Sequence, residues 1–338
     1  MATIEDVAKR AGVSVSTVSY ALSGKRPVAL ETRKRILAII EEMEYHPHAM
    51  ASGLASRRSR ILGILYPTET RALSEGQLDL ILNMTQTATQ NGYSVMLWST
   101  PLRPEEVWKL ARQYLLDGAI LTEVARHDPR VELLKSKEFP FVMLGRIHDN
   151  TGISFVDIDF ADTLRQCVEH LASLGHSEIA FINGSHELLR SETNWTLCAL
   201  EGFTRAVNDH QLHGEVYYCM PTPEHAYELV NDLLAQRPEL TAIIIVTDSI
   251  APGVLRALNE ANLRIPEDFS VISNFPARTA ELASPALTSL EKVPPGQEIG
   301  CLAANVLIDR LEGRSHGPVQ ILLTPSLVTH QSSGPRRG

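Results

Sequence analysis

The stretch "EDVAKRAGVSVSTVSYALSGKRPVALETRKRILAIIEEMEYHPHAMASGLASRR", residues 5–58, decides the fold of the amino-terminal region. It contains three short segments with helical spacing, a junction around a proline, and a run rich in Ala, Ser and Gly. Its second segment carries hydroxyl side chains where a solvated helix more often carries Lys and Glu. The stretch therefore predicts a small helical domain with one specialised face, joined to the rest of the chain by a separate linker.

The first two segments have the signals of a helix-turn-helix. Thr3 is expected to cap a helix over Ile4–Ala11, because Asp6 stands three residues later as in a capping box. Gly12 allows a turn at positive φ, and a second helix over Val15–Ser23 follows. Small residues where helices approach, with a flexible turn between them, are typical of this motif.

The second helix has two distinct sides on a helical wheel at about 100° per residue. Ser14 is expected to cap it, and Val15, Val18 and Leu22 fall on one apolar side. The other side presents hydroxyl groups, which can bond base edges and phosphates. These hydroxyls belong to Ser16, Ser19, Tyr20 and Ser23. The alternative is the polar surface of an ordinary small bundle, and the nearby cations favour DNA because they form a phosphate-holding rim. The cations are Lys25, Arg26, Arg33, Lys34 and Arg35.

A third helix is expected over residues 31–44, and the segment after it allows two interpretations. Ile36, Ile39, Ile40 and Met43 repeat at helical spacing, which indicates packing only. Residues 47–60 are either a flexible linker or a helix that forms only when docked, because so short a helix is unstable alone. In the second case Leu54 is a candidate wedge for a minor-groove base step.

Charge is segregated along the chain. The net charge is −9, yet the first 60 residues hold ten Lys/Arg and six Asp/Glu, a local charge of +4, which leaves −13 for the remainder. A basic head on an acidic body can be steered to a polyanion head-first. The global acidity therefore does not argue against nucleic acid.

Several classes of protein and site are disfavoured by composition. No apolar run approaches a membrane span, and the first residues lack a secretion signal, so we expect a cytoplasmic protein. The cysteines are widely spaced, without a C-x-x-C pair, as expected of idle thiols. His46 and His48 flank Pro47, which breaks the spacing of a helical metal pair, so no metal and no cofactor are expected.

After Arg60 short apolar runs alternate with helix-like segments, as in "ILGILYP", "AIIIVTD" and "FSVIS". This alternation predicts parallel sheets covered on both faces. The strands are too many for one small sheet, so two subdomains are expected. The predicted fold class is thus α/β with an all-α helix-turn-helix headpiece.

Ligands of such sheets bind beyond the carboxyl ends of the strands. Residues there could hold a small polar ligand, although each could also be an ordinary loop residue. The candidates are Tyr66, Thr68, Arg146, Arg190, Trp195, Thr247, Asp248 and Phe275.

Enzymatic function is disfavoured. The sequence has no G-x-G-x-x-G, P-loop, G-x-S-x-G or H-E-x-x-H pattern. Asp157 and Asp159 lie two residues apart, but no proton-transfer partner is identifiable.

The chain resembles the LacI/GalR family of bacterial repressors. The resemblance rests on "TIEDVAKRAGVSVSTVSYAL", "ALETRKRILAIIEEMEYHP" and "ASGL" in the head, and on "GHSEIAFING", "RIPEDFSVIS", "SPALTSL" and "LLTPSLV" in the body. It spans essentially the whole chain, and it implies a periplasmic-binding-protein-like body of two doubly wound parallel-sheet subdomains.

For the head, the resemblance implies a second helix docked in the major groove of DNA. Val15, Ser16 and Tyr20 would reach bases, and Leu54 would enter the minor groove. Ser14, Thr17, Ser19 and Tyr45 would hold phosphates, with Thr3, Ser23 and Ala55 completing the interface. Tyr20 and Ala55 stand where relatives carry Arg or Lys, and Ser52 where many carry Arg, so the half-site bases and the phosphate contacts should differ.

For the body, the resemblance implies a small-molecule effector between two lobes that three crossing segments connect. Two polar anchors of the family are replaced, by Ala199 and by Phe275. We therefore expect an effector other than a typical free monosaccharide, one that is less polar or that stacks on Phe275 or Trp195. Arg146 and Arg190 are expected to take an anionic or hydroxyl end.

The expected organisation has three parts and a tail. The crossings are placed near 159–162, 290–293 and 323–326. The parts are a headpiece over residues 1–46, a hinge over 47–60, an effector-binding and dimerisation domain over 61–330, and a flexible tail over 331–338. Within 61–330, the N-subdomain is expected over 61–160 and 292–324, and the C-subdomain over 161–291 and 325–330.

These features together predict a transcription regulator. It would bind a pseudo-palindromic double-stranded operator as a homodimer, under effector control. The tail has no heptads for a tetramer. A regulator that answers to a partner protein or to no ligand, and a solute-binding protein, remain the alternatives.

Overall fold

The computed structural model describes residues 2–23, 26–43, 58–67, 73–113, 115–275, 278–291 and 294–336. The chain divides into two compact units, Met1–Ser59 and Arg60–Gly338. Among the described residues, no helix is long and apolar enough to cross a bilayer.

The first unit contains three helices, α1 (Ile4–Ala11), α2 (Val15–Ser23) and α3 (Leu30–Glu42). The predicted capping box is confirmed: Thr3 N donates to Asp6 Oδ2 at 2.9 Å, and Asp6 N donates to Thr3 Oγ1 at 3.3 Å. Gly12 ends α1 in the left-handed region, at φ 64°. Helix-turn-helix geometry thus follows directly from local sequence.

The three helices share one small apolar core. It is built by Val7, Ala8, Ala11, Val18, Ala21 and Ile36. Ile39, Ile40 and Met43 pack against it, so the predicted stripe of α3 is confirmed. Val15, which the helical wheel places on the apolar side of α2, is 40% exposed and does not belong to this core. Val15 lies in the first turn of α2, and the core of this small domain is closed by Val18 and Ala21 instead.

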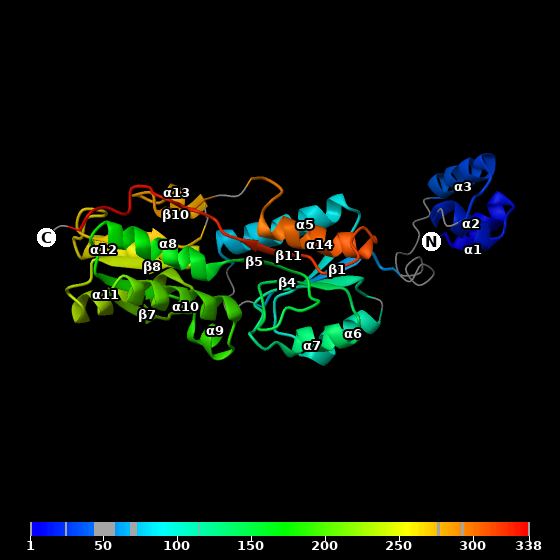
Figure 1. The fold of residues 1–338 in the computed structure, drawn as a ribbon. Coiled ribbons are helices and arrows are strands. Elements are labelled where there is room, and N and C mark those ends of the chain that lie inside the picture. The colour runs from blue at the N-terminus through cyan, green and yellow to red at the C-terminus, as the bar shows by residue number, and fades with distance from the viewer. Residues whose placement is uncertain are drawn as a thin grey trace. The chain divides into compact units, whose positions relative to one another are not determined.

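The second unit contains two six-stranded sheets (Figure 1). The first sheet is parallel throughout, in the order β11-β5-β4-β3-β1-β2. Its strands are β1 (Ile61–Leu65), β2 (Ser94–Trp98), β3 (Gly118–Leu121), β4 (Phe141–Leu144), β5 (Phe155–Ile158) and β11 (Gln320–Leu323).

Helices cover both faces of this first sheet. One face packs against α5 (Glu75–Gln90) and α14 (Ile299–Leu311), and the other against α6 (Pro104–Arg112) and α7 (Pro129–Ser136) (Figure 1). The continuous apolar runs of the strands follow from this double burial.

The second sheet has the order β12-β10-β9-β8-β6-β7, parallel except for the β10–β12 pair. Its strands are β6 (Glu178–Ile182), β7 (His213–Tyr217), β8 (Ala242–Ile245), β9 (Ser270–Ser273), β10 (Thr288–Leu290) and β12 (Leu327–Val328). In β8, Ile243 and Ile245 face α11 (Pro223–Gln236) and α12 (Ala251–Glu260), whereas Ile244 faces α8 (Phe160–Ser173) and α10 (Asn194–Asp209).

The chain passes between the two sheets three times. It leaves the first sheet after β5, returns after β10 to α14, and passes again between β11 and β12. Residues 292 and 293, within one of the expected crossings, lie outside the described residues.

The expectation of a flexible tail over 331–338 is wrong as far as Arg336. Ser332 and Ser333 are buried, and Thr288 N donates to Ser332 Oγ at 2.8 Å. Gly334 N donates to Ser270 Oγ at 3.2 Å, and Arg336 N donates to Leu174 O at 2.9 Å. The serines of this segment satisfy polar groups of β9 and β10 in the second sheet.

The turn at Gly12 gives a prediction for the head. Replacing Gly12 by Ala should destabilise the first unit by roughly 1–2 kcal/mol, because an L-residue resists φ 64°. An added Cβ meets no atom within 4 Å, so the cost is conformational and not steric. Calorimetry should show an earlier transition of the head alone. Gly12→Asn, which tolerates this conformation, is the matched control, and equal losses in both variants would contradict this explanation.

The buried His176 gives a prediction on pH. Its Nε2 donates to Gly334 O at 3.0 Å, so the neutral Nδ1 accepts from Thr241 Oγ1 at 2.9 Å. Burial lowers the pKa of His176 from its usual 6.5. The unfolded chain therefore binds the proton more tightly, and the free energy of unfolding should fall as the pH falls below 6.5.

Denaturant titrations between pH 5 and pH 7 should show a smaller pH slope for His176→Gln than for the natural protein. Burial also lowers the pKa of His170, so His170 contributes part of the pH slope in both proteins. The raised pKa of Asp157 contributes to the pH slope with the opposite sign. Its contribution is the same in both proteins and cancels when their slopes are compared. Identical slopes would show that His176 is not protonated on unfolding.

Candidate functional site

The amino-terminal end of α2 presents a network of hydroxyl groups. Thr17 N donates to Ser14 Oγ at 3.2 Å, which caps the helix as predicted. Ser14 Oγ also lies 2.7 Å from Ser16 Oγ and 2.8 Å from Thr17 Oγ1. Ser14, Val15 and Ser16 are exposed. An exposed helix start with fixed hydroxyls suits contacts with phosphates and base edges.

Tyr20 continues this surface one turn later. It is half-buried, as are Thr17 and Ser19, and the Arg26 guanidinium lies 5.4 Å from the centroid of its ring. Arg33 Nε donates to Ala21 O at 3.2 Å, near the carboxyl end of α2. The cations that the sequence places around α2 are thus partly fixed against it.

Other residues predicted at the DNA interface cannot be placed. Tyr45, Leu54 and Ala55 lie outside the described residues, and so does the side chain of Ser23. Thr3 caps α1 and bonds Asp6.

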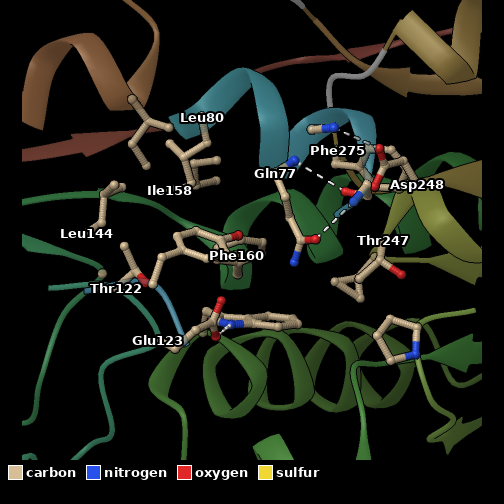
Figure 2. A pocket seen from close by; sticks show the side chains of 18 of the residues that line it. Gln77, Leu80, Thr122, Glu123, Leu144, Ile158, Phe160, Thr247, Asp248 and Phe275 are labelled. Atoms are coloured by element: carbon tan, nitrogen blue, oxygen red, sulfur yellow. Dashed lines mark hydrogen bonds between the residues drawn. The ribbon is translucent and has the colours of Figure 1, made fainter. Parts of the chain in front are cut away.

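A cavity of about 320 Å³ lies at the carboxyl ends of strands from both sheets. Its wall includes the predicted residues Tyr66, Trp195, Thr247, Asp248 and Phe275. The last three are labelled in Figure 2. The carboxyl-end rule therefore located five of the eight predicted effector residues. Thr68 lies outside the described residues.

Arg146 and Arg190, which were predicted at the effector site, are not among the residues that line this cavity. Arg146 Nε donates to Asp157 Oδ2 at 2.7 Å, and its side chain is 22% exposed. Parallel pairing of β4 with β5 sets Leu144 beside Val156, which brings the following Arg146 and Asp157 together. Arg190 ends the short helix α9 (His186–Arg190) and is exposed.

Most other lining residues were not predicted from the sequence, among them Glu123, Phe160 and Gln77. Glu123 follows β3 and accepts a hydrogen bond from Trp195 Nε1 at 2.8 Å. The ring of Phe160, at the start of α8, lies 5.6 Å from that of Trp195. Glu123 obeys the carboxyl-end rule and could have been found with it. Phe160 and Gln77 come from the first turns of helices and carried no signal (Figure 2).

The two family anchors replaced in this sequence lie in different places. Ala199 is fully buried in the core under α10 and contributes no polar group. Phe275 lines the cavity and also packs against the α11 and α12 side of the second sheet.

Burial shapes the electrostatics of the cavity. It raises the pKa of Asp157 to about 6, although the Arg146 ion pair opposes the shift. Burial also raises the pKa of Tyr66 above its ordinary value, and the charges of Glu123 and Asp248 add to the rise. Both shifts have the sign expected of a partly desolvated, acidic environment.

Hydrogen bonds join the two subdomains around the cavity. Asp248, in the short 3-10 turn Asp248–Ile250 beyond β8, accepts from Gly76 N in the first turn of α5 at 2.9 Å. Arg126, beyond β3, donates to Glu201 Oε1 at 2.8 Å and to Asn194 Oδ1 at 3.2 Å, both on α10. A change in these few bonds can alter how far the cleft is closed.

Metal-binding side chains and cysteines could support other chemistry. The described residues contain no group of three His, Cys, Asp or Glu suited to a metal ion. The pair His46 and His48 lies outside them. All four cysteines are free thiols.

Comparison with known proteins gives concordant results. The family "Bacterial regulatory proteins, lacI family" matches residues 3–48, and "Periplasmic binding protein-like domain" matches residues 168–333. Catabolite control protein A of Priestia megaterium is 30% identical, over 90% of this chain and 91% of its own. The HTH-type transcriptional repressor PurR of Haemophilus influenzae (strain PittEE) is 29% identical over 98% of both chains. The solved complex of the transcriptional regulator CelR with cellobiose has a TM-score of 0.69 and 26% identity, over 98% of this chain and 100% of that chain.

These matches confirm the predicted family and fold class, and they place the chain among transcription regulators rather than enzymes. The head and the cleft are the two sites that such a regulator needs. The chain belongs to the lacI family of bacterial regulatory proteins and is a DNA-binding transcriptional repressor with a periplasmic-binding-protein-like effector domain.

Proposed function

We propose that the protein binds a pseudo-palindromic operator as a homodimer, with α2 in the major groove, and that a small molecule in the cleft controls this binding. The observation that carries the proposal is the exposed hydroxyl surface at the start of α2, on a unit whose core is closed by the opposite side of that helix. Two identical heads on a two-fold dimer match a palindrome. Such a protein acts on DNA in the cytoplasm.

We assign the head residues to two roles. Val15, Ser16 and Tyr20 read base edges, and the exposure of Val15 supports this because an apolar side chain can contact a thymine methyl group. The remaining residues hold the backbone or the minor groove. They are Thr3, Ser14, Thr17, Ser19, Ser23, Tyr45, Leu54 and Ala55.

The cleft is the proposed effector site. A cavity of about 320 Å³ with mostly apolar walls and a few polar groups suits a small molecule. The complex of the relative CelR with cellobiose supports the assignment by analogy. A protein partner as regulator would have less need of such a cavity.

Coupling between the sites requires two states of the second unit. A ligand that changes the bonds of Asp248 with Gly76 and of Arg126 with α10 would shift the equilibrium between an open and a closed cleft. In a dimer this shift would alter the spacing of the two heads and hence operator affinity.

The proposed dimer is supported by exposed apolar side chains at one edge of the first sheet. Leu78 and Leu82 are four residues apart on α5, and Met96 and Leu97 lie on the edge strand β2. Helix α5 packs beside β2, so these residues lie at the same edge of the sheet, with Met96 and Leu97 on its opposite faces. Grouped exposed apolar side chains mark interaction sites more often than solvated surface.

The operator proposal predicts different effects for two kinds of variant. Tyr20→Ala should change which half-site sequences bind, because a base contact is lost. The binding free energy that distinguishes the bases at one position of the half-site should fall by roughly 1–3 kcal/mol. Thr17→Val should weaken binding to all sequences alike, because a phosphate contact is lost. Selection from random DNA followed by mobility-shift titration measures both.

The same substitution at Thr89, exposed on α5 in the body, is the control and should leave operator binding unchanged. Should the intact protein retard no genomic promoter fragment in dilute buffer, with or without metabolite extract, the proposed function is wrong.

The dimer proposal predicts that Leu78→Glu/Leu82→Glu is monomeric in sedimentation experiments, because two charges would be desolvated in the interface. Leu322→Glu is the matched control, since Leu322 is also exposed but lies on β11 at the opposite edge of the same sheet. A dimer that survives the first change, or is lost with the second, would place the interface elsewhere.

A further inference from the structure

Two histidines of the first sheet meet outside the cleft. His127 lies in the loop between β3 and α7, and His148 lies in the loop between β4 and β5. Strands β3 and β4 are parallel neighbours, so the loops that follow them leave the sheet at the same edge. The ring centroids of the two histidines are 5.6 Å apart, and the ring planes are inclined by 46°. Neither residue lines the cavity.

Hydrogen bonds fix the backbone of both loops. His148 N donates to Arg126 O at 2.9 Å, which ties one loop to the other. In the first loop, the carboxylate of Asp128 accepts from two backbone N–H groups, at 3.3 and 2.9 Å. In the second loop, Asn150 accepts from Ile147 N at 3.1 Å and donates to Ile147 O at 2.9 Å. The two imidazoles therefore extend from defined backbone positions.

The imidazole rings of His127 and His148 are exposed and available. Within the described part of the chain, no residue forms a hydrogen bond with a ring nitrogen of either side chain. His170 and His176, by contrast, each bond with the carboxyl-terminal segment. Imidazole nitrogens are the ligands that late first-row divalent cations prefer in proteins.

The spacing of the two rings fits one shared cation. A Zn–N bond of about 2.1 Å, with about 1.2 Å from the nitrogen to the centre of the ring, places a bound ring centroid about 3.3 Å from the ion. Two centroids 5.6 Å apart then subtend an angle of about 115° at the ion, close to the tetrahedral value of about 109°. Because both side chains are exposed, each ring can rotate to turn a nitrogen to the ion.

The charged groups around the pair do not exclude a cation. Arg126 and Arg130 flank His127 in the first loop, and each forms an ion pair with a carboxylate, at 2.8 and 2.6 Å. The exposed carboxylate of Asp149 interacts with both Lys135 and His148, so it offsets the charge of the lysine. The positive charges near the two rings are thus balanced by carboxylates.

We propose that His127 and His148 together bind one late first-row divalent cation, such as Zn²⁺, Ni²⁺ or Cu²⁺, on the surface of the N-subdomain. The two imidazoles supply two ligands, and water completes the coordination, as at an open site. Mg²⁺ and Ca²⁺ are excluded because they take oxygen ligands. The proposal is independent of the proposed function, since neither histidine belongs to the head or to the cleft.

A cation at this place would act on a loop that contacts the other subdomain. Ala125 forms an antiparallel bridge with Thr193, and Arg126 donates to Glu201 on α10 at 2.8 Å. A metal ion that joins His127 to the second loop would restrain these contacts from the N-subdomain side.

Calorimetric titration of the tag-free full chain with Zn²⁺ tests the proposal. We expect one saturable site per chain, which an excess of Mg²⁺ does not displace. His127→Gln and His148→Gln should each lower the affinity for Zn²⁺ by about ten-fold or more, because the loss of an outer partner of a metal ligand alone can cost that much. Circular dichroism should show an unchanged fold, since both side chains are exposed.

Two double variants are the matched controls. His210→Gln/His213→Gln removes two exposed histidines near β7, and His46→Gln/His48→Gln removes the closely spaced pair that flanks Pro47. Both should retain the affinity of the natural chain. A natural chain that binds no Zn²⁺ overturns the proposal. So does an unchanged affinity in His127→Gln and His148→Gln, or loss of the site in either control.

Pulsed electron paramagnetic resonance with Cu²⁺ as the probe counts the ligands independently. The spectrum of the natural chain with one equivalent of Cu²⁺ should show the remote nitrogens of two coordinated imidazoles. His127→Gln and His148→Gln should each show one imidazole at most. A single imidazole in the natural chain, or two in both variants, contradicts a site shared by these histidines.

Discussion

The cleft depends on one topological constraint: in a parallel sheet all strands end at the same edge. Both sheets of the second unit end their parallel strands at the cavity, so residues distant in sequence meet there. Tyr66 follows β1, Glu123 follows β3, Thr247 follows β8 and Phe275 follows β9. The helices on both faces make this edge the accessible part of each sheet.

The same constraint explains why the charge of the cleft differs from what its sequence suggests. Neighbouring strands bring their last residues together, so an arginine after one strand can be neutralised by an aspartate on the next. Arg146 and Asp157 are such a pair. The residues that line the cavity include Glu123 and Asp248, together with aromatic rings.

Hydrogen bonds and the β-bridge between Ala125 and Thr193 hold the subdomains together around the cavity. A buried apolar interface would fix one arrangement, whereas side-chain hydrogen bonds such as those of Asp248 and Arg126 can be exchanged for bonds to a ligand. The core of each sheet, by contrast, is closed by aliphatic side chains on both faces and should move as a rigid part. The carboxyl-terminal segment adds to the rigidity of the second sheet, because Ser332 Oγ accepts from Thr288 N and Gly334 O accepts from His176 Nε2.

The sequence by itself determined the local structure of the head, the alternation of strands and helices, and the family. Caps, a glycine turn and apolar periodicity act within a few residues, so Thr3, Gly12 and the stripe of α3 could be interpreted directly. The carboxyl-end rule also found five lining residues of the cavity. Only the tertiary structure decided which of these polar groups remain available. The register between β4 and β5 pairs Arg146 with Asp157, and Arg146 does not line the cavity. Phe160 and Gln77 line the cavity from the first turns of two helices. The serines of the terminal segment form hydrogen bonds with the second sheet. These outcomes depend on contacts between residues far apart in the chain, which no local pattern records.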